Sequence, residues 1–116
     1  MKMPISEIVD RFSIACLKNI RAGADNQSEI DLLRHEMSGY NDIEEFSTKL
    51  FEINGKIWDL ESDIRKGKED ELGLEEVGRR AIQIRELNKI RVGYKNEMVK
   101  KYEEGFEDIK MNHASS

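Results

Sequence analysis

Apolar residues recur at alternating intervals of three and four along the middle of the chain. Between residues 42 and 66 they are Ile43, Phe46, Leu50, Ile53, Ile57, Leu60 and Ile64. This alternation places a single apolar stripe on one side of an α-helix, as in a coiled-coil seam. A second segment, 74–104, begins the same stripe with Leu74, Val77, Ala81 and Ile84. Because only the polar stretch KGKEDELG separates them, the two segments are predicted to form a long antiparallel helical hairpin.

Two shorter helices are predicted before the hairpin, over residues 7–22 and 29–38. The expected N-caps are Ser6, Ser28 (in a capping box with Asp31) and Asn41, and the expected left-handed residue after the first helix is Gly23. No strand pattern is present. We therefore expect an all-α fold and a single helical domain over 1–116, with a frayed C-terminal tail from about residue 106.

The amino-acid composition limits the classes of protein to which this chain can belong. With 116 residues the chain is too short for more than one domain, and 37% charged residues are typical of long helices with solvated faces. A net charge of −5 makes nucleic-acid binding improbable, since such binding needs a dominant basic face. One cysteine, no apolar leader and no membrane-length apolar run favour a cytoplasmic protein. No motif for a cofactor or a metal is present, and none is expected.

Self-association is expected from the length of the hairpin. Helices of this size reach about 36 and 45 Å at 1.5 Å per residue, which is more than one and a half short helices can cover. Phe51, Trp58, Leu87 and Ile90 widen the apolar surface beside the seam. A homodimer or a higher homo-oligomer is the simplest way to bury it.

Polar residues interrupt the seam of the second long helix. Continued past Ile84, the spacing meets Asn88, Arg91 and Lys95 before it returns to Met98. With the turn near residue 70, the numbers of facing residues add up to about 140. This register puts Asn54 near Asn88 and Glu61 near Arg79, so a polar layer between the two helices is predicted.

The polar layer has two interpretations. The first is a structural network that fixes register and partner choice, which we favour; the second is a site for a phosphate or carboxylate held by arginine and lysine. The candidate residues are the same for both: Asn54, Trp58, Glu61, Arg65, Arg79, Asn88, Arg91 and Lys95, with Asp10 and Arg11 within reach. The sequence does not determine where the first helix docks. None of these residues is assigned a catalytic role.

Three blocks of the chain carry a family resemblance. They are the opening ISEIVDRFSIACLK, the segment NGKIWDLESDIR from Asn54 to Arg65, and NKIRVGYKNEM from Asn88 to Met98. Together they resemble a family of small uncharacterised all-helical proteins of bacteria and phages. The resemblance implies no activity. The residues that it implies belong to the family pattern are Asp10, Arg11, Lys18, Asn54, Trp58, Glu61, Arg65, Asn88, Arg91 and Lys95. The chain departs from that pattern in lacking a glycine before Glu7 and in having Arg85 at an apolar position.

The leading functional expectation is a helical oligomerisation or adaptor protein that works through helix–helix contacts without catalysis. The alternative is an anion-binding module, or an enzyme acting on a phosphorylated or carboxylated substrate. That alternative requires Arg79, Arg91 and Lys95 to converge on one open pocket.

Overall fold

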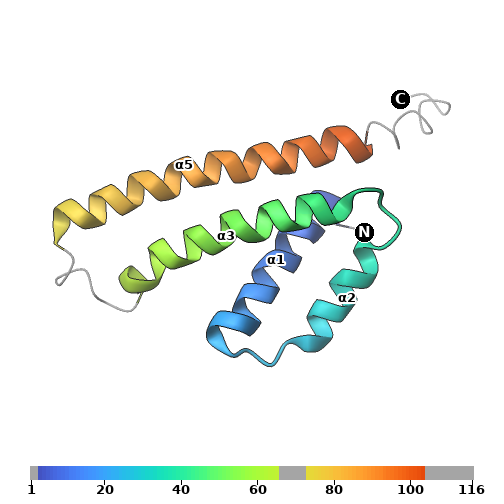
Figure 1. Cartoon of the computed structure of the whole chain (residues 1–116), viewed down its shortest axis with the longest axis horizontal. Coiled ribbons are helices and arrows are strands. Elements are labelled where there is room, and N and C mark those ends of the chain that lie inside the picture. The colour runs from blue at the N-terminus through green and yellow to red at the C-terminus, as the bar shows by residue number, and fades with distance from the viewer. Residues whose placement is uncertain (1–2, 66–72, 104–116) are drawn as a thin grey trace.

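The computed structural model describes residues 3–65 and 73–103. In chain order the helices are α1 (Ile5–Ala22), α2 (Gln27–Met37), α3 (Ile43–Arg65) and α5 (Leu74–Met98), followed by a π-helical stretch, Val99–Glu103. Figure 1 shows α3 and α5 as a long antiparallel pair, with α1 and α2 packed at one end of it. The described residues contain no strand, so the predicted all-α fold is confirmed. The predicted fraying from residue 106 and residues 66–72 of the predicted loop fall outside these residues.

The first helix begins earlier than predicted. It starts at Ile5, where the carbonyl of Pro4 accepts hydrogen bonds from the backbone N–H groups of Glu7 and Ile8 at 3.0 and 3.1 Å. Ser6 is therefore inside the helix and buried, and its predicted capping role is wrong. The predicted end is confirmed, since Gly23 adopts a left-handed conformation with φ of 65°.

The second helix also begins earlier, at Gln27, and the predicted capping box of Ser28 with Asp31 is wrong. The residue before the helix is Asn26, whose side-chain amide donates to the carbonyl of Ala15 on α1 at 3.0 Å. A tertiary contact with α1 therefore fixes the start of α2 in place of a local cap. The predicted cap of α3, Asn41, lies one residue too early, and Asp42 (φ 62°) turns the chain into that helix.

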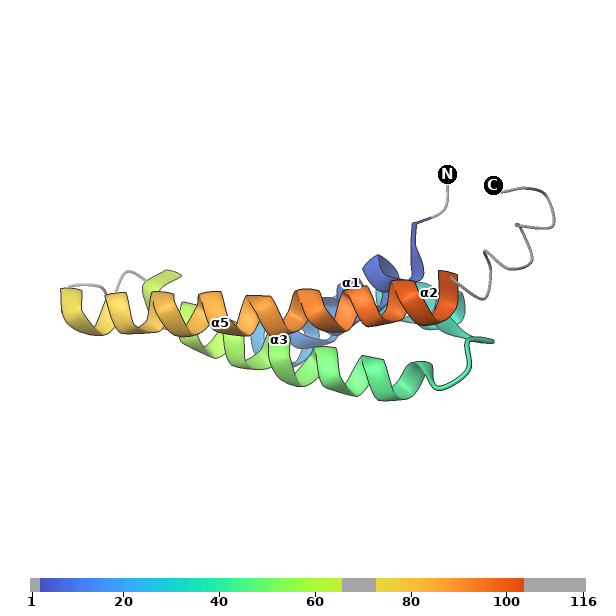
Figure 2. The same ribbon diagram turned by 90° about the horizontal axis from the view of Figure 1, so that it is seen from above.

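The hairpin has the predicted register. The views in Figures 1 and 2 agree that α3 and α5 run side by side. Near the turn, the Arg80 guanidinium donates to the carbonyl of Leu60 at 3.4 Å. At the other end the Tyr102 hydroxyl donates to the carbonyl of Asn41 at 2.5 Å. Both pairs have numbers that add up to about 140, as a turn near residue 70 requires.

The core lies where α1 and α2 pack on the hairpin. Its main cluster of buried residues is Ile5, Ile8, Val9, Ala15, Ile30, Leu33, Met37, Ile43, Phe46, Leu50 and Met98. Within Leu74–Met98, Met98 is the buried residue, so α5 lies largely at the surface.

The predicted seam is confirmed on α3 and only partly on α5. Leu74 is 89% exposed and Ala81 is exposed, whereas Arg80 is half-buried beside α3. Turning Ala81 inward would bury little apolar area, while Arg80 packs its long stem and reaches Leu60. The inward face of α5 is therefore rotated by about one residue from the prediction near the turn.

Candidate functional site

A buried carboxylate, Asp10, lies at the meeting point of three helices. It belongs to the inner face of α1, and only 5% of it is exposed. The Arg91 guanidinium on α5 donates from Nε to Oδ1 and from Nη2 to Oδ2, each at 3.1 Å. This two-point geometry is the strongest form of carboxylate–arginine pairing, because both planar groups are fixed in orientation.

The third helix contributes an amide to the same carboxylate. Asn54 Nδ2 on α3 donates to Asp10 Oδ1 at 3.0 Å and to Ser13 Oγ at 2.7 Å. The Ser13 hydroxyl in turn donates to the backbone carbonyl of Asp10 at 2.7 Å. Asn54 and Ser13 are 6% and 1% exposed, so these polar groups are satisfied by one another in place of water.

Two further contacts extend the cluster toward solvent. Asn88 Oδ1 accepts from Arg91 Nη1 at 3.1 Å. Lys95 Nζ lies 2.8 Å from Glu7 Oε2 and 4.0 Å from Asp10 Oδ2. We refer to the set Glu7, Asp10, Ser13, Asn54, Asn88, Arg91 and Lys95 as the Asp10 network.

The Asp10 network is electrically balanced. Its two carboxylates, Glu7 and Asp10, face its two cations, Arg91 and Lys95. Exposure rises from 7% for the side chain of Asp10 to 46% for that of Glu7, so the network opens to water at the Glu7 edge. Because each cation already has a carboxylate partner, an incoming anion would have to displace one.

The structure brings five of the ten candidate residues together: Asp10, Asn54, Asn88, Arg91 and Lys95. Arg79 is not among them, because it is exposed and pairs with Glu75 and Glu76 on its own helix. Twelve residues, about 18 Å of helix, separate it from Arg91. The predicted convergence of Arg79 with Arg91 and Lys95 is therefore wrong.

The other candidates lie elsewhere. Trp58 and Glu61 are half-buried on the half of α3 nearer the turn, and the side chain of Arg65 lies outside the described part of the chain. Arg11 is exposed on α1 and lines a surface depression together with Glu7 and Asp10. Sequence reasoning missed Glu7 and Ser13. The available signal was that Ser6, Asp10 and Ser13 fall within the apolar stripe of the first helix, where polar residues need partners.

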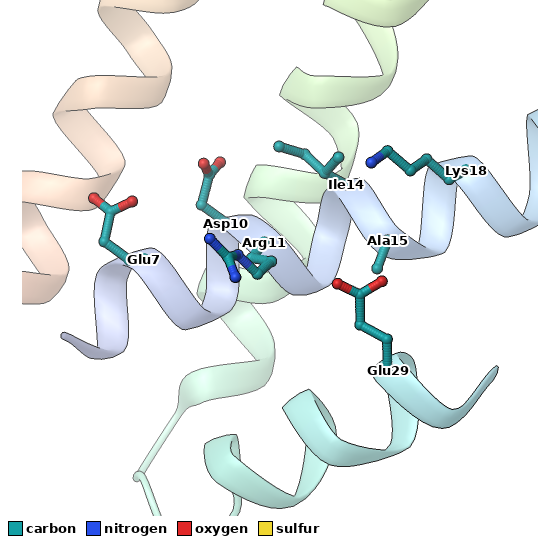
Figure 3. A pocket seen from close by; sticks show the side chains of 7 residues that line it. All are labelled: Glu7, Asp10, Arg11, Ile14, Ala15, Lys18 and Glu29. Carbon is teal, nitrogen blue, oxygen red and sulfur yellow. The ribbon is translucent and has the colours of Figure 1, made fainter. Parts of the chain in front are cut away.

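A polar depression lined by α1, with Glu29 from α2, borders the network. It has a volume of about 350 Å³ and is lined by Glu7, Asp10, Arg11, Ile14, Ala15, Lys18 and Glu29 (Figure 3). Three carboxylates and two cations line it, so its charge does not select an anion. A second depression of about 540 Å³ lies near the turn between α3 and α5, and its apolar lining is Leu60, Ile82 and Leu87.

Other kinds of site receive little support. Among residues 3–65 and 73–103, no group of three or more His, Cys, Asp or Glu is placed to hold a metal ion. Burial raises the pKa of the Cys16 thiol, with Arg34 opposing it, so this half-buried group is a weak nucleophile at neutral pH. None of the described helices combines the length and apolar character that crossing a membrane demands.

Comparison with known proteins finds no matching family model, no similar curated protein and no similar solved structure. The family resemblance of the three sequence blocks therefore stays a prediction.

Proposed function

We propose that this chain is a helical assembly module that acts through helix–helix contacts, first with a second copy of itself, and not through catalysis. The observation that supports the proposal is the uncovered state of α5. On this helix Leu74, Ile82, Ile90 and Val92 are 89%, 54%, 45% and 50% exposed, and Val99 directly after it is 37% exposed. An apolar surface of this kind gains free energy when another protein surface covers it.

The layout of the fold supports the same function. The turn end of the hairpin extends beyond α1 and α2 as an arm (Figure 1). The Asp10 network ties α1 to both helices of the hairpin near the base of that arm. Buried polar networks of this type set the register of packed helices. A fixed register suits an arm that presents a rigid surface to a partner.

The alternative, binding of a phosphorylated or carboxylated small molecule at the polar layer, has weaker support. Arg91 donates to both oxygens of Asp10, and Lys95 pairs with Glu7, so neither cation faces an open pocket without a partner. Displacing Asp10 would leave a buried carboxylate without its counter-ion, which costs several kcal/mol. The proposal includes a cytoplasmic location, because the single cysteine suits a reducing compartment.

Sedimentation velocity over a wide range of protein concentration tests the proposal. The expected result is a reversible shift from the 13.5 kDa monomer to a species of twice that mass. A monomer at every concentration would refute self-association. A rise in melting temperature in inorganic phosphate, absent in Arg91→Met, would favour the anion-binding alternative.

A further inference from the structure

Four exposed apolar residues lie in a symmetric arrangement, three on α5 and the fourth, Val99, at the first position of the π-helical stretch that continues it. Leu74, Ala81, Val92 and Val99 are separated by seven, eleven and seven residues. At 3.6 residues per turn these positions fall within about 20° of one another around the helix axis. All four are exposed, and Figure 1 shows α5 along an outer edge of the molecule. They form one straight apolar line on the surface, here called the α5 line.

The intervals between the residues of the α5 line, seven, eleven and seven, are the same from either end of the helix. A second copy of α5 laid antiparallel, with a two-fold axis between Glu86 and Leu87, therefore matches the line with itself. Leu74 then faces Val99 of the partner subunit, and Ala81 faces Val92 of the partner subunit. A two-fold contact requires this self-complementarity, because the same surface is used by both copies.

Flanking charges agree with the same axis. The pairing brings Lys100 close to Glu75 of the partner subunit, and Lys89 close to Glu86 of the partner subunit. Both pairs have opposite charges, as the flanking positions of paired helices do when they select a partner. Gly78 faces Asn96 of the partner subunit, and no heavy atom lies within 4 Å of a Cβ built at Gly78, so a side chain can approach there.

Two residues oppose the pairing. Glu86 lies next to Glu86 of the partner subunit at the axis. Arg85 lies on the α5 line close to the axis, so the two copies also bring these like charges near each other. Within one copy its guanidinium is 3.7 Å from Glu86, and 67% of its side chain is exposed, so it can turn toward water. The association is therefore expected to be reversible.

Building on the proposed function, we propose that two copies of this chain associate through an antiparallel α5–α5 contact centred between Glu86 and Leu87. Disulfide cross-linking in a Cys16→Ser background tests this geometry. Mixed Ala81→Cys and Val92→Cys variants should form a cross-linked dimer. Ala81→Cys alone should not, because its two sites would lie about 16 Å apart along the axis, beyond the reach of a disulfide.

The outcomes separate this inference from the proposed function. A monomer by sedimentation refutes both. A dimer that cross-links through Ala81→Cys alone, or through neither sample, refutes the antiparallel α5 contact and leaves self-association intact. A dimer that cross-links in the mixed sample and not in Ala81→Cys alone supports both.

Substitutions give a second measurement by sedimentation. Val92→Glu should raise the dimer Kd by about tenfold or more, since it puts a carboxylate in the contact. The matched control is Leu32→Glu on α2, another exposed apolar residue (62%) off the α5 line, which should leave Kd unchanged. Arg85→Leu should lower Kd by about tenfold by removing the two arginine charges that lie near each other close to the axis. Equal effects of Val92→Glu and Leu32→Glu would overturn the assignment.

Discussion

Asp10 and Arg91 are 81 residues apart in the chain, yet two N–H groups of Arg91 donate to the two carboxylate oxygens of Asp10 at 3.1 Å each. This contact joins α1 to α5. The polar residues that interrupt the apolar seam of α5 therefore have a partner on α1, and their partners do not come from α3 alone. All unfolding measurements on this chain are to be made at one protein concentration, because the proposed self-association would add to stability.

Replacing Asp10 by alanine should lower the free energy of unfolding by about 2–4 kcal/mol. The change leaves the Arg91 guanidinium and the Asn54 amide without their common acceptor in a largely buried place. Urea denaturation measures the effect. Asp31→Ala is the control, because its pair with Arg34 is 62% exposed on both sides and should change stability by less than about 0.5 kcal/mol.

The double variant Asp10→Ala with Arg91→Met should be more stable than the sum of the single effects predicts. Removing both partners leaves no unpaired charge, so a coupling free energy of about 1–3 kcal/mol is expected from the double-mutant cycle. Strictly additive effects would contradict the paired geometry.

Gly55→Ala should stabilise the protein less than Gly93→Ala. Both glycines lie inside helices, where alanine is better by about 1 kcal/mol. A Cβ at Gly55 would lie 3.3 Å from Arg21 Nη2 and 3.7 Å from Leu17, whereas one at Gly93 meets no heavy atom within 4 Å. The close contact offsets the gain at Gly55, because Arg21 also donates to the Gly55 carbonyl and would have to move. Thermal unfolding compares the two, and an equal gain in both variants would show that α1 does not approach Gly55.

Tyr102→Phe should cost about 0.5–1.5 kcal/mol, because the hydroxyl donates to the carbonyl of Asn41 at the open end of the hairpin. Tyr94→Phe is the matched control, since the described contact of Tyr94 is made by its ring with Lys49 and should survive.

The contribution of Tyr102 should also depend on pH. Burial raises the pKa of Tyr102, so folding favours the neutral phenol. Its contribution is therefore complete below the ordinary phenol pKa of about 10 and is lost as the pH rises through the higher folded value. Unfolding curves at neutral and strongly alkaline pH should show the difference between wild type and Tyr102→Phe shrinking with pH.

Alkylation of Cys16 by iodoacetamide near neutral pH should be slower in the folded protein than in urea. Burial raises the pKa of this thiol, so less thiolate is present at a given pH, and the half-buried sulfur is also less accessible. The rate in the folded protein should rise with pH beyond the point where the denatured chain levels off. Matching rates in the two states at neutral pH would contradict this environment for Cys16.

Much of the fold follows from local patterns. The alternation of three and four from Ile43 to Ile64 is enough to predict α3, because a helix repeats every 3.6 residues. The short link between the long helices makes them antiparallel and sets the register that Leu60 and Arg80 confirm. Gly23 ends α1 as expected, since few other residues adopt its backbone conformation. Helix starts were less predictable, because contacts such as Asn26 with Ala15 replaced the local caps.

The helices, the hairpin, its register and the presence of polar residues in the seam can all be predicted from the sequence, because each depends on spacing along the chain. Which groups satisfy those polar residues depends on how the helices pack in three dimensions. Periodicity shows which face of α1 is buried but not where that face docks, so it could not pair Asp10 with Arg91 or separate Arg79 from them. Periodicity also could not show that Arg80 faces α3 while Ala81 faces outward. That rotation of α5 depends on whether the long side chain of Arg80 can reach the carbonyl of Leu60 on α3.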